Sequence, residues 1–233
     1  MVEPVKRFKT GIPGLDDLIE GGFPEGSSIL ISGTPGTGKT TLGIQFIYNG
    51  AKEYNDNGLI ITVEENKDQI IRNMGRYGFD LEKMVDADKI TIVEEPVLFE
   101  RIVTHETIEE IIKKKNIKRV VFDSLTLFKH VYPDEEKRRR EILRFIETFR
   151  NMKCTCLFTM ERPSSGLDHY FPEEFFMDGL IIMGQLIMSK KTKTTRILGV
   201  IKLRGTKHPN HFYPMRFDDK GVVIYSEEEI FEV

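Results

Sequence analysis

The chain has 233 residues, of which 39% are hydrophobic and 30% are charged, and its formal net charge is −3. These values are typical of one large globular domain, so we predict a single domain over residues 1–233. The slight negative charge argues against a dedicated nucleic-acid binder, which needs excess positive charge to neutralise phosphates. No apolar run is long enough to span a bilayer and no signal peptide is visible, so we expect a cytoplasmic protein.

Strand-like apolar runs alternate with helix-like amphipathic runs along the first two thirds of the chain. The predicted strands are residues 27–32, 59–63, 90–93, 120–123 and 154–160. The predicted helices are residues 40–54, 67–78, 99–115 and 135–152. Such alternation is typical of an α/β fold, in which helices cover both faces of a mostly parallel sheet.

The last third of the chain has a different pattern. Strand candidates at residues 180–188, 195–203, 212–217 and 222–225 follow one another without long helices between them. Consecutive strands with short connections usually pair antiparallel. We therefore expect an antiparallel C-terminal extension of the same sheet, within the same domain.

The segment Gly33–Thr40 reads GTPGTGKT and matches the P-loop pattern at every fixed position. It follows the predicted strand 27–32 and opens the predicted helix 40–54, as a P-loop must. Its glycines let backbone N–H groups turn inward around an anion, and the helix N-terminus adds partial positive charge. Lys39 would reach the β- and γ-phosphates, and the Thr40 hydroxyl would bind Mg²⁺. The predicted site for ATP or ADP with Mg²⁺ comprises Gly33, Thr34, Pro35, Gly36, Thr37, Gly38, Lys39, Thr40 and Thr41.

Asp123 is the candidate for the second Mg²⁺ residue. A P-loop requires an acidic residue at the carboxyl end of a neighbouring strand. Asp123 directly follows the apolar run 120–122, which places it at such a strand end. The alternative is that Asp123 caps the segment that follows it.

Two carboxylates, Glu64 and Glu65, end the second predicted strand. Carboxylates at a buried strand end are costly unless they have a function, and this edge of an open α/β sheet is the ligand side. Glu64 is the candidate to orient the attacking water or to accept its proton. The alternative role, which we consider for Glu65, is an acidic cap for the helix 67–78.

Four segments of the chain resemble the KaiC family, a branch of the RecA-like ATPases. They are residues 11–50, which include the P-loop, residues 62–81, residues 120–128 (VVFDSLTLF) and residues 200–208 (VIKLRGTKH). The resemblance runs from about Thr10 to Tyr225 and covers one KaiC-type domain, whereas the circadian clock protein of the family has two in tandem. It implies a RecA-like fold, ATP hydrolysis, and a homo-oligomeric ring, a hexamer, that holds ATP between its subunits.

The resemblance also assigns further residues. In the KaiC pattern, the K-x-R of KLRGT reaches the γ-phosphate of the neighbouring subunit's ATP, and Lys202 and Arg204 stand at these positions. It implies a phosphate contact for His208, a contact on the adenine side for Arg76, and nucleotide-lining positions for Leu203, Thr206 and Asp219.

Elementary strand geometry agrees with the assignment of Lys202 and Arg204. Residues two apart in a strand point to the same face, and two cations on one face suit a transferring phosphoryl group. Cations supplied across an interface act as an arginine finger. The alternative is a solvated edge strand that carries ordinary surface charges.

Other functions are compatible with these motifs. One is a DNA recombination or repair ATPase, with DNA held by the loops at 164–176 and 189–195 or by the basic run 137–140. Another is a scaffold that binds nucleotide without hydrolysing it. A third is an autokinase, whose acceptors would be Ser164, Ser165, Thr192, Thr194 or Thr195.

Overall fold

The computed structural model describes residues 5–94, 105–163, 171–187 and 194–228. The predicted start of the helix 99–115, the acceptor candidates Ser164, Ser165 and Thr192, and most of the two loops considered for DNA lie outside these ranges.

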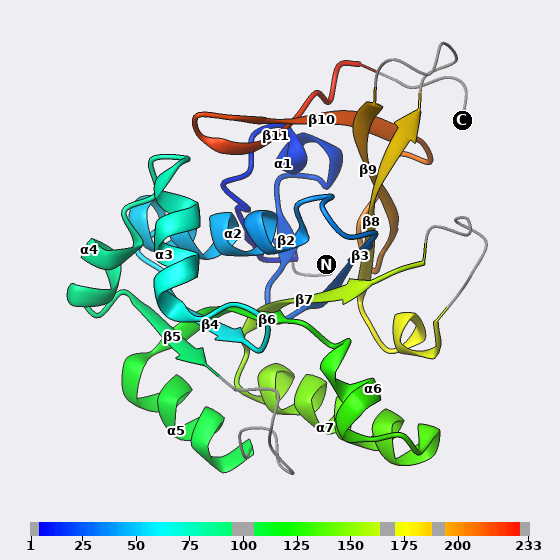
Figure 1. The fold of residues 1–233 in the computed structure, drawn as a ribbon. Helices are drawn as coiled ribbons and strands as arrows, with labels where there is room; N and C mark the ends of the chain where they lie inside the picture. Colours follow the sequence, from blue (N-terminus) through cyan, green and yellow to red (C-terminus); the bar gives the residue numbers. More distant parts are fainter. Residues whose placement is uncertain (1–4, 95–104, 164–170, 188–193, 229–233) are drawn as a thin grey trace.

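Within the described residues, nine strands form one sheet in the order β11-β10-β9-β8-β3-β7-β6-β4-β5 (Figure 1). The parallel strands are β3 (Ser28–Gly33), β4 (Asn57–Thr62), β5 (Ile90–Glu94), β6 (Ile117–Asp123), β7 (Thr155–Glu161) and β8 (Gly179–Ile187). The antiparallel strands are β9 (Thr194–Leu203), β10 (Phe212–Asp218) and β11 (Gly221–Ile224). A separate antiparallel pair is formed by β1 (Arg7–Phe8) and β2 (Phe23–Pro24). The predicted mostly parallel sheet with an antiparallel C-terminal extension is confirmed.

The extension begins one strand later than the sequence suggested. We expected antiparallel pairing from residue 180 onward, but β8 is parallel to β3. The sheet order is β8-β3-β7, so β8 lies on the other side of β3 from β7. A crossover of a dozen or more residues returns the chain to the same starting edge and therefore gives a parallel strand.

Helices cover both faces of the sheet (Figure 1). The helices over the first face are α1 (Leu15–Leu18), α2 (Lys39–Glu53), α3 (Lys67–Gly75) and α4 (Leu81–Asp86). Those over the second face are α5 (His105–Lys115), α6 (Leu127–Val131) and α7 (Glu135–Asn151), and a 3₁₀ turn, η1 (Pro172–Phe175), also lies against α7. Side chains of β3 alternate between the two cores, because Ile29 and Ile31 join the first and Leu30 joins the second. In the described ranges, no helix has both the length and the apolar character needed to cross a membrane.

Arg119 is a charged side chain inside the first core. Its Nε and Nη2 atoms donate to Asp56 Oδ2 at 2.9 and 2.7 Å, and Nη1 donates to the carbonyl of Lys9 at 2.8 Å. The guanidinium also lies 4.6 Å from the ring centre of Phe46 and 5.3 Å from that of Tyr54. Burial lowers the pKa of Arg119, and the hydrogen bonds to Asp56 oppose that shift. Arg119, on β6, thus pairs its charge with Asp56 and also binds the N-terminal segment at Lys9.

Replacing Asp56 with Ala should destabilise the fold by about 3 kcal/mol, because it leaves the Arg119 charge buried without its carboxylate. Urea unfolding followed by circular dichroism measures this loss. The matched control is Glu109→Ala, which breaks the exposed pair with Lys113 on α5 and should change the free energy of unfolding by less than about 0.5 kcal/mol. Equal effects of the two variants would contradict this account of Arg119.

Candidate functional site

The P-loop connects the end of β3 to the start of α2. Gly36 and Gly38 have φ angles of 77° and 101°, in the left-handed region that favours glycine. A Cβ atom on Gly38 would lie 2.4 Å from Cζ of Phe217, so the loop passes directly against that ring. Thr37 is buried and its hydroxyl donates to the carbonyl of Thr34 at 2.8 Å. The motif therefore has the compact loop that its sequence predicts.

Lys39 lies inside this loop. Its Nζ atom donates to the carbonyl oxygens of Gly33 at 3.0 Å and Thr34 at 3.2 Å. Burial lowers the pKa of Lys39, and the carboxylates of Glu161 and Asp123 oppose that shift. Phosphate oxygens carry a full negative charge and are stronger acceptors than these carbonyls. The ammonium group is thus placed to exchange backbone acceptors for a nucleotide's phosphates.

Thr40 and Asp123 meet beside the loop. The Thr40 hydroxyl donates to Asp123 Oδ2 at 2.7 Å, and the Thr159 hydroxyl donates to Oδ1. Burial raises the pKa of Asp123, whereas the two hydroxyl donors lower it. Within the described residues, the carboxylate makes no hydrogen bond to the segment that follows it, so nothing there supports a capping role. A hydroxyl and a carboxylate in contact supply the oxygen ligands that Mg²⁺ prefers, so these residues fit the ion.

Glu64 lies just beyond the carboxyl end of β4, next to the carboxyl end of β6, where Asp123 lies. Its Oε1 atom accepts a hydrogen bond from the Ser124 hydroxyl at 2.6 Å, and its side chain is exposed. The backbone N–H of Val63 donates to the carbonyl of Asp123 at 2.9 Å, which ties the two strand ends together. The carboxylate proposed to handle water is therefore held beside the residue proposed for Mg²⁺.

Glu65 does not cap helix α3, contrary to the role we considered for it. The cap is Asn66, whose side chain accepts from the backbone N–H of Gln69 at 2.9 Å, while the Gln69 side chain accepts from the backbone N–H of Asn66 at 3.1 Å. This reciprocal pair satisfies the helix terminus without an acid. Glu65 instead accepts from the Asn73 side chain at 3.0 Å and also lines the cavity described next.

These side chains surround a cavity of about 660 Å³. Its lining includes most of the predicted core of the site: Pro35, Gly36, Gly38, Lys39, Thr40, Thr41, Glu64 and Asp123. Sequence reasoning missed other lining residues, namely Tyr77, Ser124, Glu161, Arg196 and Phe217. A volume of this size is in the range of pockets that bind small molecules and cofactors.

Three of the missed residues form one wall of the cavity. The rings of Tyr77 and Phe217 are stacked with centroids 5.8 Å apart, and the Arg196 guanidinium lies 4.9 Å from the Phe217 ring centre. Arg196 also donates from Nε to the carbonyl of Gly36 at 3.3 Å. The sequence indicated Tyr77 only as an apolar position of a predicted helix. The places of Arg196 and Phe217 depend on the register of β9 and β10. No sequence signal pointed to this wall.

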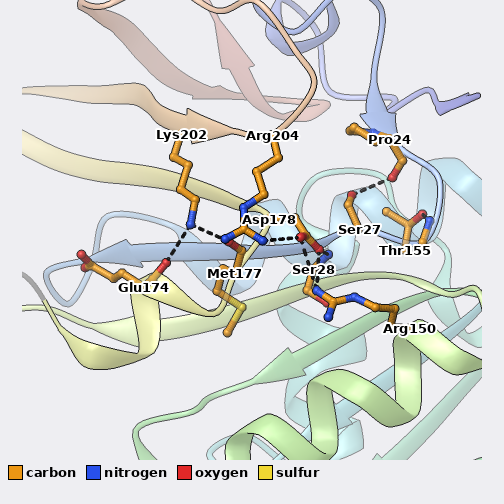
Figure 2. A network of polar contacts seen from close by, with 11 residues as sticks. Pro24, Ser27, Ser28, Arg150, Thr155, Glu174, Met177, Asp178, Lys202 and Arg204 are labelled. Carbon is orange, nitrogen blue, oxygen red and sulfur yellow. Dashed lines mark hydrogen bonds and ion pairs between the residues drawn. The ribbon is translucent and has the colours of Figure 1, made fainter. Parts of the chain in front are cut away.

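Lys202 and Arg204, the edge cations, are held by the segment that precedes β8 (Figure 2). Lys202 Nζ donates to the carbonyl of Met177 at 2.7 Å and to that of Glu174 at 3.3 Å. Arg204 Nη1 donates to Asp178 Oδ1 at 3.4 Å. The described lining of the P-loop cavity includes neither edge cation.

Strand register places the edge cations at the amino-terminal ends of the parallel strands, whereas the P-loop lies at their carboxyl ends. We call these two sides of the sheet its amino-terminal edge and its P-loop edge. Leu203 pairs with Gly179, and Gly179 pairs with Ile29, four residues before Gly33. At about 3.3 Å per residue, the end of β9 lies roughly 13 Å along the strand direction from the start of the loop. The backbone N–H of Arg204 donates to the carbonyl of Asp178 at 2.9 Å, which fixes the start of the turn there. The edge cations thus belong to the amino-terminal edge of the parallel strands.

A bulge in β9 decides where Lys202 points. Val200 pairs with Ile181 and Lys202 pairs with Leu180, so Ile201 is the extra residue. Because side chains alternate along a strand, one extra residue moves every later side chain to the other face. Lys202 consequently lies on the face of the second core, beside η1.

The other residues implied by the KaiC resemblance also lie outside the described cavity lining. Leu203 is buried in the first core. Thr206 accepts a hydrogen bond of 2.8 Å from the N-terminal segment, and His208 is half-buried in the same turn. Arg76 and Asp219 are exposed, but each is close in sequence to an aromatic residue of the cavity wall.

Comparison with known proteins identifies the family. A family model described as "ATPase: KaiC" matches residues 8–229. The circadian clock oscillator protein KaiC of a Picosynechococcus species is 35% identical over 239 residues, and that of Synechococcus elongatus is 34% identical over 234 residues. Each comparison covers 96% of this chain and 45% of the relative, so the chain spans less than half the length of these relatives.

A solved structure gives the same result for the fold. The crystal structure of a KaiC-like protein from the hyperthermophilic archaeon Pyrococcus horikoshii OT3 superposes with a TM-score of 0.85 at 37% sequence identity. The superposition covers 95% of this chain and 100% of the archaeal one. The chain therefore belongs to the KaiC family of ATPase domains and has the RecA-like fold of that family.

Proposed function

We propose that this chain binds ATP with Mg²⁺ in the P-loop cavity and hydrolyses it within a homo-oligomeric ring, a hexamer. Each site would be completed by the edge cations of the neighbouring copy. One observation carries this proposal: the residues that we assign to phosphoryl transfer are divided between opposite edges of one sheet. A single copy does not bring the two sets together, whereas head-to-tail contacts between copies would, and such contacts form a ring when the rotation between copies closes.

The P-loop edge would bind the phosphates and the ion. Lys39 and the loop N–H groups would hold the phosphate oxygens, as the Lys39 hydrogen bonds to loop carbonyls support. Thr40 and Asp123 would hold Mg²⁺, which neutralises charge on the phosphate oxygens when it is bound.

Glu64 would position the attacking water. The water oxygen forms a bond to the γ-phosphorus, the bond between that phosphorus and the bridging oxygen breaks, and the water's proton passes to Glu64. The products are ADP and phosphate. The Ser124 hydroxyl, 2.6 Å from Glu64 Oε1, would orient the carboxylate. The neighbour's edge cations would stabilise the negative charge on the transferring phosphoryl group.

The remaining residues implied by the KaiC resemblance fall into the same two groups, one at each edge of the sheet. Leu203, Thr206 and His208 follow Lys202 at the amino-terminal edge, so we assign them to the neighbour's nucleotide. Arg76 and Asp219 are close in sequence to Tyr77 and Phe217, so we assign them to the base of the chain's own nucleotide. Flat aromatic rings suit a nucleobase, because such faces stack.

The proposal is tested first by substituting Lys39. Lys39→Ala should weaken ATP binding by about 100-fold, because one charge-assisted contact of roughly 3 kcal/mol is lost. Isothermal titration calorimetry measures the affinity, and light scattering with phosphate release follows assembly and turnover in parallel. Lys52→Ala is the matched control, since Lys52 lies in the last turn of the same helix and its side chain is exposed.

The same samples decide between the alternatives. A hexamer-sized species that releases phosphate supports the proposal. A species that assembles with ATP but releases no phosphate would make the chain a nucleotide-dependent scaffold. A monomer that binds ATP without turnover would remove the role of the edge cations in the neighbour's site.

The basic run 137–140 gives little support for a DNA-binding function. Arg138 donates to the carbonyl of Tyr132 at 3.3 Å and lies 3.7 Å from the Glu173 carboxylate. The Arg139 guanidinium lies 4.7 Å from the ring centre of Phe176. These cations join α7 to η1 and α6, so they are engaged within the chain. Single-stranded DNA that stimulated phosphate release would contradict this interpretation.

A further inference from the structure

Asp178 is shared by two arginines (Figure 2). Arg204 Nη1 lies 3.4 Å from Oδ1, and Arg150 Nη2, on α7, lies 3.3 Å from Oδ1 and 3.1 Å from Oδ2. The backbone N–H of Ser28 also donates to Oδ2 at 3.0 Å. One carboxylate therefore receives a backbone donor and two guanidinium groups that approach from different elements.

The three partners hold this carboxylate with unequal strength. The Ser28 contact is a backbone hydrogen bond at the start of β3, and the N–H of Asp178 donates back to the Ser28 carbonyl at 2.8 Å. The Asp178 side chain is 19% exposed, whereas that of Arg204 is 58% exposed and its contact is the longest. Asp178 is thus fixed to the sheet, and Arg204 is the partner that can leave.

If Arg204 leaves, the charge of the Asp178 carboxylate is not left without a partner. Asp178 would keep its ion pair with Arg150 and its hydrogen bond from Ser28. Losing every cationic partner would cost far more, because a partly buried carboxylate without compensation is strongly unfavourable. The Asp178–Arg204 pair itself contributes little, because the Arg204 side chain is exposed and the contact is long.

On the basis of the proposed function, we infer that Asp178 is a positioning residue for the arginine finger. It holds Arg204 at the subunit edge while the neighbour's site is between turnovers, and Arg150 keeps this hold weak by occupying the same carboxylate. When negative charge develops on the neighbour's γ-phosphate, Arg204 moves to it and Arg150 remains on Asp178. The pair Asp178–Arg150 thereby sets how readily the finger is released.

The inference predicts opposite effects for the two partners. Arg150→Met removes the competing cation, so Asp178 holds Arg204 more tightly and kcat should fall about two- to fivefold. Asp178→Asn keeps an acceptor for Ser28 but removes the charge, so Arg204 is released and kcat should rise by a similar factor. KM for ATP should stay unchanged in both variants, because ATP binds at the P-loop edge of the neighbouring copy.

Further variants separate this role from a merely structural one. Arg150→Lys keeps a cation near Asp178 and should restore most of the turnover lost in Arg150→Met. The double variant Arg150→Met with Asp178→Asn should behave like Asp178→Asn alone, because no charge is left to compete for. Arg144→Met is the matched control, since Arg144 lies on the same helix, has an exposed side chain and pairs with Glu141 and not with Asp178.

The test is the rate of phosphate release by each assembled variant. Arg204→Ala is measured in the same experiment. Opposite shifts in kcat, together with rescue by Arg150→Lys, support the inference. If Arg204→Ala abolishes turnover but Arg150→Met and Asp178→Asn both lower it or leave it unchanged, the positioning role of Asp178 is wrong. If Asp178→Asn does not fold, failure of Arg150→Lys to rescue Arg150→Met overturns the inference equally. Full turnover in Arg204→Ala would instead contradict the proposed finger itself.

Discussion

Mixing the Lys39→Ala and Arg204→Ala variants should restore ATP hydrolysis that neither variant shows alone. Arg204→Ala by itself is expected to lower kcat by a factor of about 10³ to 10⁵, the range for loss of an arginine finger. Lys39→Ala is expected to be inactive for a different reason, because it binds the nucleotide about 100-fold more weakly. The two lesions lie at opposite edges of the sheet, so a mixed ring contains sites in which neither lesion is present.

The size of the rescue follows from the geometry. In an equal mixture, a site has an intact P-loop in about half of the cases and receives an intact edge cation in about half, so about a quarter of the sites are complete. Phosphate release after subunit exchange should therefore approach about a quarter of the wild-type rate. A mixture that remains inactive, although light scattering shows mixed rings, would mean that Arg204 acts within its own chain.

The control mixture combines Lys39→Ala with Glu64→Gln. Both residues line the same cavity, so every site in a mixed ring carries one of the two lesions. No rescue is expected. Recovery of activity in this mixture would show that Glu64 serves the neighbouring site, which would move it to the other side of the interface.

The second large effect concerns Glu64 alone. Glu64→Gln should lower kcat by a factor of about 10² to 10⁴, the usual contribution of a general base, and should leave the affinity for ATP unchanged. Glutamine has the same shape and can still accept the Ser124 hydrogen bond, but it cannot take a proton from water. Single-turnover phosphate release and calorimetric titration of ATP separate the two quantities.

Glu65→Gln is the matched control, because Glu65 is the next residue and lines the same cavity. Its carboxylate is engaged by Asn73 at 3.0 Å, so we expect turnover close to that of the wild type. If Glu65→Gln is inactive and Glu64→Gln retains full activity, the base is Glu65 and the contact between Glu64 and Ser124 has another role.

Strand β9 connects the two halves of the proposed mechanism. Near its start, Arg196 contacts the chain's own P-loop at the carbonyl of Gly36. At its end lie Lys202 and, one residue beyond the strand, Arg204. Because β9 runs antiparallel to the central strands, its start lies at the P-loop edge of the sheet and its end lies at the opposite edge. A parallel strand of the same sequence would reverse these positions and place the edge cations near the P-loop.

The amino-acid sequence by itself determined the local parts of the site. The P-loop could be recognised because its glycines, Lys39 and Thr40 lie within one short segment between a strand and a helix. The position of Asp123 and Glu64 beside the P-loop could be predicted because each follows a short apolar strand, and parallel strands bring their carboxyl ends to the same edge. The alternation of strands and helices also predicted the fold class, which depends on the periodicity of burial and not on exact register.

The tertiary structure alone decided what depends on register and on distant pairing. The parallel direction of β8 follows from a crossover past β3, and the position of Lys202 on the face of the second core follows from the bulge at Ile201. Neither has a local signal in the sequence. The wall of Tyr77 and Phe217 joins segments about 140 residues apart, and such contacts leave no trace in the periodicity of either segment. The family resemblance implied that Arg204 serves a neighbouring site, but no local signal showed its separation from Lys39, because that separation depends on the antiparallel pairing of β9 with β8.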